Sequence, residues 1–346
     1  MPKFFFNYSV DSACPYHRLL LPARYCRDEM AARGVELVAG EGMPPGYDVY
    51  FFHGLANQDG VLAFQKLKNK GAKFVWSVDD DWLTIPDWNP AKPDDDGIAS
   101  YHLLKGLADW VLTSTPHLAR TFSDVGRKVL CAPNLMDVSA FPEVPYTTMP
   151  DGSRNYAFDV RLPVRVVWTG GVTHKKDVEV MTEAVDMVLD RLKGKAVVVY
   201  QGMSPPAPLL TKYLHRGLFH QKSVPFASYQ SILNSVQANV YLAPLAKVDF
   251  NLAKSNLRVM EGWCLMAPPV ATPWGEYNCI QSGVDGRYAD SPDEWYSAIH
   301  RLVTDHPYRL TMAAEGRKRV EESYSWAEPS CRVDWVNAFT RIAEGL

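Results

Sequence analysis

Small and basic residues meet where a predicted strand gives way to a helix in the second half of the chain. The strand expected at residues 164–169 is followed by Gly170 and Gly171, and then by His174 and Lys176. Adjacent glycines let a backbone approach an anion closely, and a helix start with a lysine adds positive charge. Plain tight turns use glycines in the same way. The spacing therefore indicates a phosphate-binding turn, with an unliganded turn as the alternative.

A second polar cluster follows the strand expected at 238–243. It contains Asn251, Lys254, Ser255, Asn256 and Leu257, with Glu261 about a turn and a half into the next helix. Ser255 or Asn256 can cap that helix and leave backbone N–H groups free for an anion. A carboxylate beside a phosphate-binding turn is well suited to accept hydrogen bonds from ribose hydroxyls. A salt bridge or a solvated helix edge is the alternative for Glu261.

Three adjacent carboxylates, Asp79, Asp80 and Asp81, follow the strand expected at 73–78. Because they repel one another, we expect them to have a role beyond filling a loop. Clustered carboxylates can bind a hard cation, cap the following turn, or orient an acceptor and take its proton. All three interpretations remain open here.

The first predicted strand is followed by a helix that begins near His17 and Arg18. A guanidinium is suited to phosphate, and an imidazole is suited to an acceptor hydroxyl. We expect Arg18 to contact an anionic ligand and His17 to face its acceptor. A structural role is the alternative for a histidine at a helix start.

Apolar runs alternate with helical patterns through most of the chain, which predicts parallel sheets with crossover helices. Strands are expected at 3–8, 35–39, 49–53, 73–78, 110–113, 129–132, 164–169, 196–200, 217–220, 238–243 and 268–272. A segment rich in proline and glycine at 142–153 separates two series. We therefore expect two Rossmann-like α/β domains, at 1–145 and 163–326, joined by a linker at 146–162. The last segment, at 327–346, carries an apolar helical stripe, which predicts a helix that packs on one of the two domains.

Composition limits the possible functions. The net charge of the 346 residues is −3, but residues 161–260 hold 13 basic against 6 acidic side chains. This favours an anionic ligand in the second half over a nucleic-acid coat or a strongly basic membrane-docking surface. No run approaches the roughly 20 apolar residues of a membrane span, so no stable membrane insertion is expected. Six scattered cysteines without a C-x-x-C pair argue against zinc and favour a reduced, cytoplasmic setting.

The segment 164–277 resembles the donor domain of retaining GT-B glycosyltransferases, the glycogen-synthase-like group (family 4-like). Gly170 and Lys176 match that group's Gly-Arg…Lys pattern, with Gly171 in place of the arginine. Glu261 matches the second of two glutamates, and Ala253 replaces the first. The resemblance implies that the small-small-Leu turn, here Ser255-Asn256-Leu257, holds a diphosphate through its backbone amides.

The resemblance implies the GT-B fold, in which the last helix, here at 327–346, crosses back and packs on the first domain. It also implies transfer of a sugar from a nucleoside-diphosphate-sugar, UDP-sugar favoured, to an acceptor hydroxyl with retention. It implies no cofactor and no metal. The donor-binding set is then Arg18, Gly170, Gly171, His174, Lys176, Asn251, Lys254, Ser255, Asn256, Leu257 and Glu261. The catalytic set on the acceptor side is His17, Asp79, Asp80 and Asp81. With the family arginine missing, His174, Lys175 or Lys254 would have to supply its charge.

The pattern Trp-Thr-Gly-Gly-x-x-His-x-x-Asp is similar to a subgroup found in phage and bacterial genomes. A phage enzyme would work in the host cytoplasm, and its acceptor could be a hydroxymethylated pyrimidine in DNA. The acidic first half argues against DNA, and a cell-surface glycan is the alternative acceptor. A nucleotide-sugar epimerase and a non-catalytic binding module are the rival functions. An oxidoreductase is disfavoured because G-x-G-x-x-G is absent.

Overall fold

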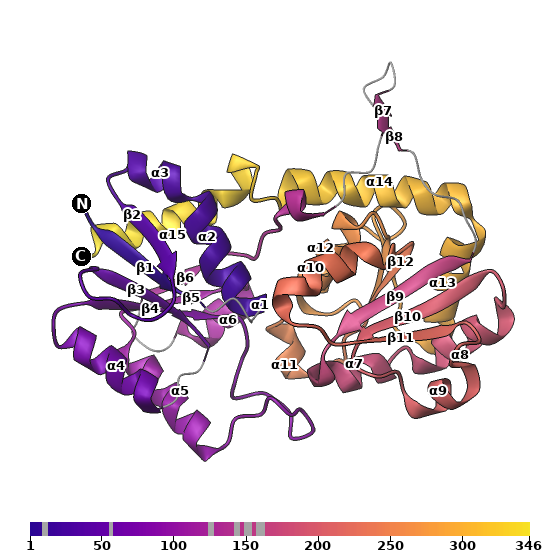
Figure 1. Cartoon of the computed structure of the whole chain (residues 1–346), viewed down its shortest axis with the longest axis horizontal. Helices are drawn as coiled ribbons and strands as arrows, with labels where there is room; N and C mark the ends of the chain where they lie inside the picture. Colours follow the sequence, from indigo (N-terminus) through magenta and orange to yellow (C-terminus); the bar gives the residue numbers. More distant parts are fainter. Residues whose placement is uncertain (9–12, 55–57, 124–127, 142–145, 149–153, 157–162) are drawn as a thin grey trace. The chain divides into compact units, whose positions relative to one another are not determined.

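A computed structural model describes residues 1–8, 13–54, 58–123, 128–141, 146–148, 154–156 and 163–346 (Figure 1). The chain forms two compact units. The first unit comprises 1–135, Leu252–Ser255 and Ser325–Leu346, and the second comprises Met136–Asn251 and Asn256–Tyr324. The chain therefore returns to the first unit at its C-terminal end, as the sequence predicts.

The first unit is built on a six-stranded parallel sheet. Its order is β2-β1-β3-β4-β5-β6, with β1 at Lys3–Asn7, β2 at Glu36–Gly40, β3 at Val49–His53, β4 at Lys73–Val78, β5 at Trp110–Thr113 and β6 at Lys128–Cys131. Its helices are α1 (Ala13–Pro15), the π-helical turn η1 (Tyr16–Leu20), α2 (Leu21–Tyr25), α3 (Arg27–Ala32), α4 (Gln58–Lys68), α5 (Asp95–Leu107) and α6 (Pro116–Thr121).

Side-chain alternation divides the core of the first unit between the two faces of its sheet. Phe4 and Phe6 of β1 point to one face, and Phe5 points to the other. Helix α15 (Val333–Glu344) covers the first of these faces (Figure 1). Its Phe339 ring lies 5.4 Å from the Phe6 ring, and Trp335 Nε1 donates to the Pro133 carbonyl at 2.8 Å. The predicted packing of the last helix on the first domain is confirmed.

The second unit has its own six-stranded parallel sheet. Its order is β11-β10-β9-β12-β13-β14, with β9 at Val164–Gly170, β10 at Ala196–Gly202, β11 at Leu218–Lys222, β12 at Val240–Ala243, β13 at Pro269–Ala271 and β14 at Arg287–Tyr288. The flanking helices are η4 (Val172–His174), α7 (Lys175–Glu179), α8 (Thr182–Arg191), α9 (Ala207–Tyr213), α10 (Phe226–Ser235), α11 (Asp249–Leu252), α12 (Leu257–Cys264), η5 (Gly275–Cys279), α13 (Pro292–Thr304) and α14 (His306–Ser323).

The structure contains each of the eleven predicted strands, displaced by no more than two residues at either end. Strand β14 was not predicted because its two residues are too short to show a period. The helix expected to begin near His17 and Arg18 is instead broken into η1, α2 and α3. Pro22, which has no N–H to donate, lies at the start of α2. Most of the predicted linker at 146–162 lies outside the described residues. Its described parts are the strands β7 (Tyr146–Thr148) and β8 (Arg154–Tyr156), which pair antiparallel.

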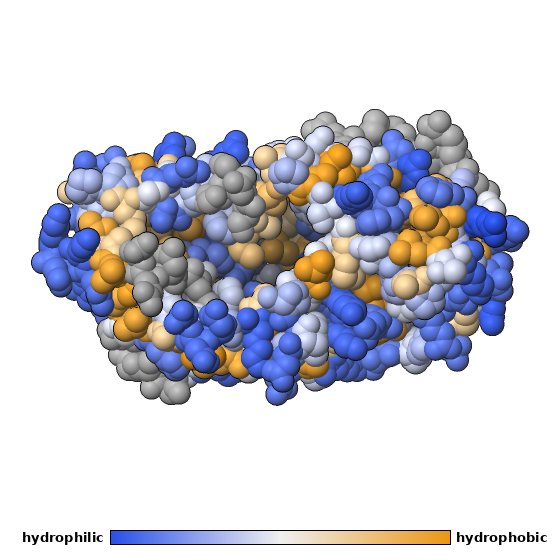
Figure 2. Space-filling view, turned by 60° about the horizontal axis from the view of Figure 1, so that its bottom comes forward, coloured by the Kyte–Doolittle hydropathy of each residue, from blue (hydrophilic) through white to orange (hydrophobic). Residues whose placement is uncertain are grey.

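Apolar residues on the face shown in Figure 2 form small patches among hydrophilic ones. Within the described residues, no helix combines the length and the apolar character needed to cross a bilayer.

Candidate active site

The glycine turn lies at the carboxyl edge of the second sheet, where parallel α/β sheets bind ligands. Gly170 ends β9 and pairs with Gly202 at the end of β10. A Cβ on Gly170 would lie 2.7 Å from the Trp168 ring, and one on Gly202 would lie 2.3 Å from the Gly170 oxygen. Gly171 is exposed, and nothing lies within 4 Å of its missing Cβ. The fold therefore requires glycine at 170 and leaves open space beside 171.

His174 and Lys176 follow this turn on η4 and α7. The Lys176 ammonium lies 2.6 Å from Glu179 Oε2, and both side chains are nearly half exposed. An exposed pair of this kind contributes only about 0–1 kcal/mol, so Lys176 can exchange Glu179 for an anion. His174 Nδ1 lies 2.8 Å from Asp177 Oδ2. The histidine is therefore held in a fixed orientation at the start of α7.

Asp177 is a buried residue that the sequence analysis did not select. Its Oδ1 accepts from the Ala246 backbone N–H at 2.7 Å and from Asn251 Nδ2 at 2.9 Å, while Oδ2 faces His174. Asn251 Nδ2 also donates to the Ala246 carbonyl at 2.8 Å. The Asn251 side-chain amide thus ties the segment after β12 to α7. The side-chain N–H groups of Asn251 are engaged within the protein, which argues against the predicted contact with a nucleotide-sugar.

Helix α12 begins at Leu257 without a side-chain cap. Asn256 is at the N-cap position, but its Nδ2 contacts Cys279 Sγ at 3.4 Å, and it makes no cap hydrogen bond. Ser255 belongs to the first unit, where its Oγ accepts from Asn134 Nδ2 at 2.9 Å. Capping by Asn256 is therefore wrong. The first-turn N–H groups of α12 receive no side-chain cap from it and stay available to an anion.

Glu261 lies on α12 in a hydrogen-bonded network. Its Oε1 accepts from Tyr229 at 3.1 Å and its Oε2 accepts from Tyr241 at 2.7 Å. Both tyrosine hydroxyls also lie close to Thr169 Oγ1, at 3.2 and 2.5 Å. Burial raises the pKa of Glu261, while Arg258 and the two tyrosines oppose that rise. Each carboxylate oxygen still has acceptor capacity for a further hydroxyl.

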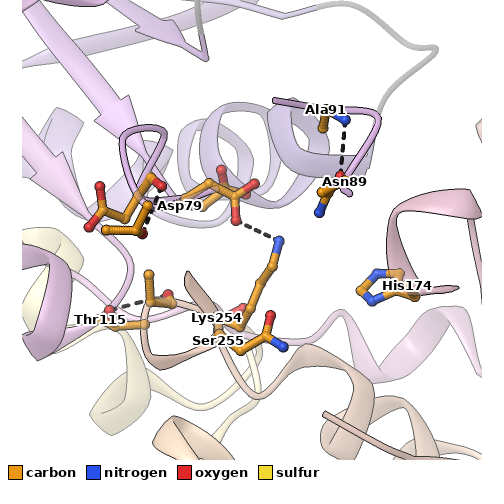
Figure 3. A network of polar contacts seen from close by, with 12 residues as sticks. Asp79, Asn89, Ala91, Thr115, His174, Lys254 and Ser255 are labelled. Atoms are coloured by element: carbon orange, nitrogen blue, oxygen red, sulfur yellow. Dashed lines mark hydrogen bonds and ion pairs between the residues drawn. The ribbon is translucent and has the colours of Figure 1, made fainter. Parts of the chain in front are cut away.

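Lys254 is located in the first unit, although α12 follows it directly in sequence. Its Nζ lies 2.6 Å from Asp80 Oδ1, the contact drawn as a dashed line in Figure 3. Burial raises the pKa of Asp80, and the ion pair with Lys254 opposes this. The adjacent Ala253 carbonyl accepts from Thr115 Oγ1 at 3.4 Å (Figure 3). Lys254 therefore neutralises Asp80, which argues against its predicted contact with a diphosphate.

Asp79 is held by two neighbours, His53 and Cys14. His53 Nε2 lies 3.1 Å from Asp79 Oδ1, and the Cys14 thiol is a second hydrogen-bond partner. Burial alone would raise the pKa of Asp79, but His53, Cys14 and Lys254 hold it well below its usual range. The candidate ligand atoms of Cys14, His53 and Asp79 all lie within 4.8 Å of one another. His53 Nδ1, on the other side of the ring, is buried and has no hydrogen-bond partner within the described residues.

Asp81 caps the turn that follows the acidic run. Its Oδ1 accepts from the Leu83 N–H at 3.3 Å, and its carbonyl accepts from the Thr84 N–H at 3.1 Å. Of the three interpretations given above for the acidic run, capping of the following turn fits Asp81. The Asp81 side chain is 5% exposed, which leaves little surface for contact with an acceptor.

Arg18 is fully buried in the first unit. Its guanidinium donates to the Ala132 carbonyl at 2.6 Å and to Asn134 Oδ1 at 3.2 Å, and it stacks 4.6 Å from the Trp335 ring. Burial lowers its pKa to about 10. Because Arg18 has no exposed surface, its position contradicts the expected contact with an anionic ligand. The neighbouring His17 is partly exposed on η1, with its ring edge-on to Tyr16.

Comparison with known proteins agrees with this architecture. A family model described as glycosyl transferase-like matches residues 187–329. HepE of Anabaena, solved with UDP and glucose, superposes with a TM-score of 0.63 at 12% identity over 100% of both chains. Sucrose-phosphate synthase of Thermosynechococcus elongatus superposes with a TM-score of 0.65 at 13% sequence identity, again over 100% of both chains. A Listeria monocytogenes protein assigned as a UDP-N-acetylglucosamine 2-epimerase superposes with a TM-score of 0.52 at 10% sequence identity. The match covers 92% of this chain and 93% of the Listeria protein. No curated protein matches in sequence.

The fold is therefore the GT-B fold, with two Rossmann-like units and a last helix that packs on the first unit. Glycosyltransferases have this fold, and so does a protein assigned as an epimerase.

Proposed function

We propose that the chain is a glycosyltransferase that moves a sugar from a UDP-sugar to an acceptor hydroxyl. One observation carries this proposal. The glycine turn and Glu261 belong to a single hydrogen-bonded network, because Thr169, which precedes Gly170, contacts both tyrosines that donate to Glu261. The network lies at the ligand-binding edge of the second sheet. This network supports a donor site in which the glycine turn binds the phosphates and Glu261 accepts from the ribose.

Each group then has a role in the donor site. Glu261 accepts hydrogen bonds from the ribose hydroxyls. The uncapped amides at the start of α12, together with His174 and Lys176, stabilise the diphosphate, where negative charge grows as the glycosidic bond breaks. UDP is favoured because HepE, which shares the fold over its whole length, was solved with UDP and with UDP-glucose.

We propose retention of the anomeric configuration. This proposal follows the resemblance to the retaining group. Glu261 is engaged by two tyrosines, so we do not assign it as a nucleophile. The leaving phosphate would take the acceptor proton.

The first unit supplies the acceptor side in this proposal. His17 is partly exposed, and Asp79 stays ionised through His53 and Cys14, so these two can orient a hydroxyl. The hydroxymethyl group of a modified pyrimidine in DNA and a cell-surface glycan are both suitable acceptors.

An assay with a labelled UDP-sugar mixture tests the function. We expect transfer to one member of a panel that includes hydroxymethylated DNA, plain DNA, glycans and small alcohols, and slow hydrolysis without an acceptor. Conversion of the donor to a different UDP-sugar without an acceptor would instead identify an epimerase, which the same fold also serves.

A further inference from the structure

Arg258, on the first turn of α12, places its guanidinium at the glycine turn. Its Nη2 lies 3.2 Å from the position a Cβ of Gly170 would occupy. Its Nη1 donates to Thr169 Oγ1 at 3.2 Å, and its centre lies 5.8 Å from the Trp168 ring. The guanidinium therefore occupies the space left by the missing side chain of Gly170.

This cation makes no direct ion pair within the described residues, although Glu261 acts on it electrostatically. Within the described part of the chain, no carboxylate oxygen lies within 4.0 Å of Arg258, and its one hydrogen bond is to Thr169. The nearby Glu261 is bonded to Tyr229 and Tyr241 instead. Arg258 is only partly buried, and Nη1 is the nitrogen of its guanidinium that donates within the described residues. A partly buried guanidinium with free donors is suited to bind an anion.

The surroundings of Arg258 are suited to a phosphate group, because a backbone turn with an adjacent glycine lets such an anion approach closely. Gly171 follows directly, is exposed and has no neighbour within 4 Å of its missing Cβ, so a ligand can reach the turn. The same network that orients Arg258 through Thr169 also holds Glu261. An anion bound at the turn would therefore lie at a fixed place relative to Glu261. The phosphates and the ribose of a nucleoside diphosphate are linked in the same way.

We infer that Arg258 is the diphosphate clamp of the donor site, reaching the glycine turn from α12. Arg258 supplies the positive charge that is missing at position 171, where a glycine stands in place of the arginine of the resembled group. Lys254 does not supply it, because it is paired with Asp80. This inference rests on the proposed function, because it assumes that a nucleoside diphosphate occupies the site.

Calorimetric titration with UDP and with uridine tests the inference, because only UDP carries the phosphates. We expect Arg258→Gln to weaken UDP binding by about 10- to 100-fold, as for a hydrogen bond to a charged group, and to leave uridine binding within about twofold. Arg258→Lys keeps the charge but not the bidentate geometry, so it should lose UDP affinity to a smaller degree. Thermal unfolding checks that each variant is folded.

Arg191→Gln is the matched control. Arg191 also stacks on a ring, 5.1 Å from Tyr296, but it ends α8, which leads into β10 and so lies at the amino edge of the sheet. The Arg191→Gln variant should bind UDP with the affinity of the wild-type protein. Unchanged UDP affinity in Arg258→Gln, an equal loss for UDP and uridine, or wild-type affinity in Arg258→Lys would overturn the clamp. A wild-type protein that binds neither ligand would instead overturn the proposed function.

Discussion

The carboxylate of Asp177 holds His174 by its Nδ1, at 2.8 Å, while its other oxygen holds the segment after β12. One buried side chain therefore joins the helix start after the glycine turn to the loop that leads to α11. A carboxylate can serve all three of its donors because it carries only acceptors.

Asp177→Asn should destabilise the protein by about 1–3 kcal/mol. The neutral amide oxygen accepts more weakly from Ala246 and Asn251 than a carboxylate does, and the N–H₂ replaces the oxygen that faces His174. Urea unfolding measures this change. His174→Ala removes one of the contacts and should cost less. If both variants unfold at the wild-type urea concentration, Asp177 does not hold the loop.

Glu261→Ala should weaken UDP binding by about 1.5–3 kcal/mol through the lost hydrogen bonds to ribose. Calorimetric titration gives the affinity. Tyr229→Phe is a useful comparison, since it removes one donor to Glu261 but leaves the carboxylate in place, and it should have a smaller effect. Unchanged donor affinity in Glu261→Ala would assign Glu261 a purely structural role.

Lys176→Ala should reduce the transfer rate by about 10²–10³ and affect donor binding less, because its charge matters most as the diphosphate leaves. Lys175, also exposed on α7, is the matched control. Steady-state kinetics separate kcat from KM. A silent Lys176→Ala beside a damaging Lys175→Ala would show that Lys175 is the residue that contacts the donor.

Asp79 should make stability depend on acid pH. Its pKa is held below the unfolded value of about 3.9, so its stabilising contribution is present above about pH 4 and is lost as pH falls toward the folded pKa. Asp79→Asn should therefore be less stable than wild type at pH 6, with a difference that shrinks at pH 3. Urea unfolding at the two pH values measures it, and a difference independent of pH would contradict the assignment.

Truncation after Trp326 should abolish transfer, because it removes α15 and exposes the face of the first sheet that Phe339 covers. Loss of a buried aromatic side chain such as Phe339 costs about 3–5 kcal/mol by itself. The second unit has its own sheet and core, so UDP binding should persist. Loss of UDP binding together with activity would show that the second unit does not fold without the tail.

The strands could be predicted because they follow from local apolar patterns, and the crossing of the last helix could be predicted only through the resemblance to the GT-B group. The partners of charged residues could not, because they depend on packing between distant segments. Arg18 is buried by Trp335 from the far end of the chain, and Lys254 is drawn into the first unit by Asp80. Arg258 could have been noticed as a basic residue three positions before Glu261, but only the fold places it beside Gly170.

Turnover of a UDP-sugar is the most direct test of the proposed function. Purified protein is incubated with candidate UDP- and GDP-sugars and an acceptor panel, and released nucleoside diphosphate is measured alongside labelled product. We predict release of UDP with label transferred to an acceptor hydroxyl, and slow release of UDP without acceptor. Neither binding nor hydrolysis of any candidate donor would contradict a glycosyltransferase.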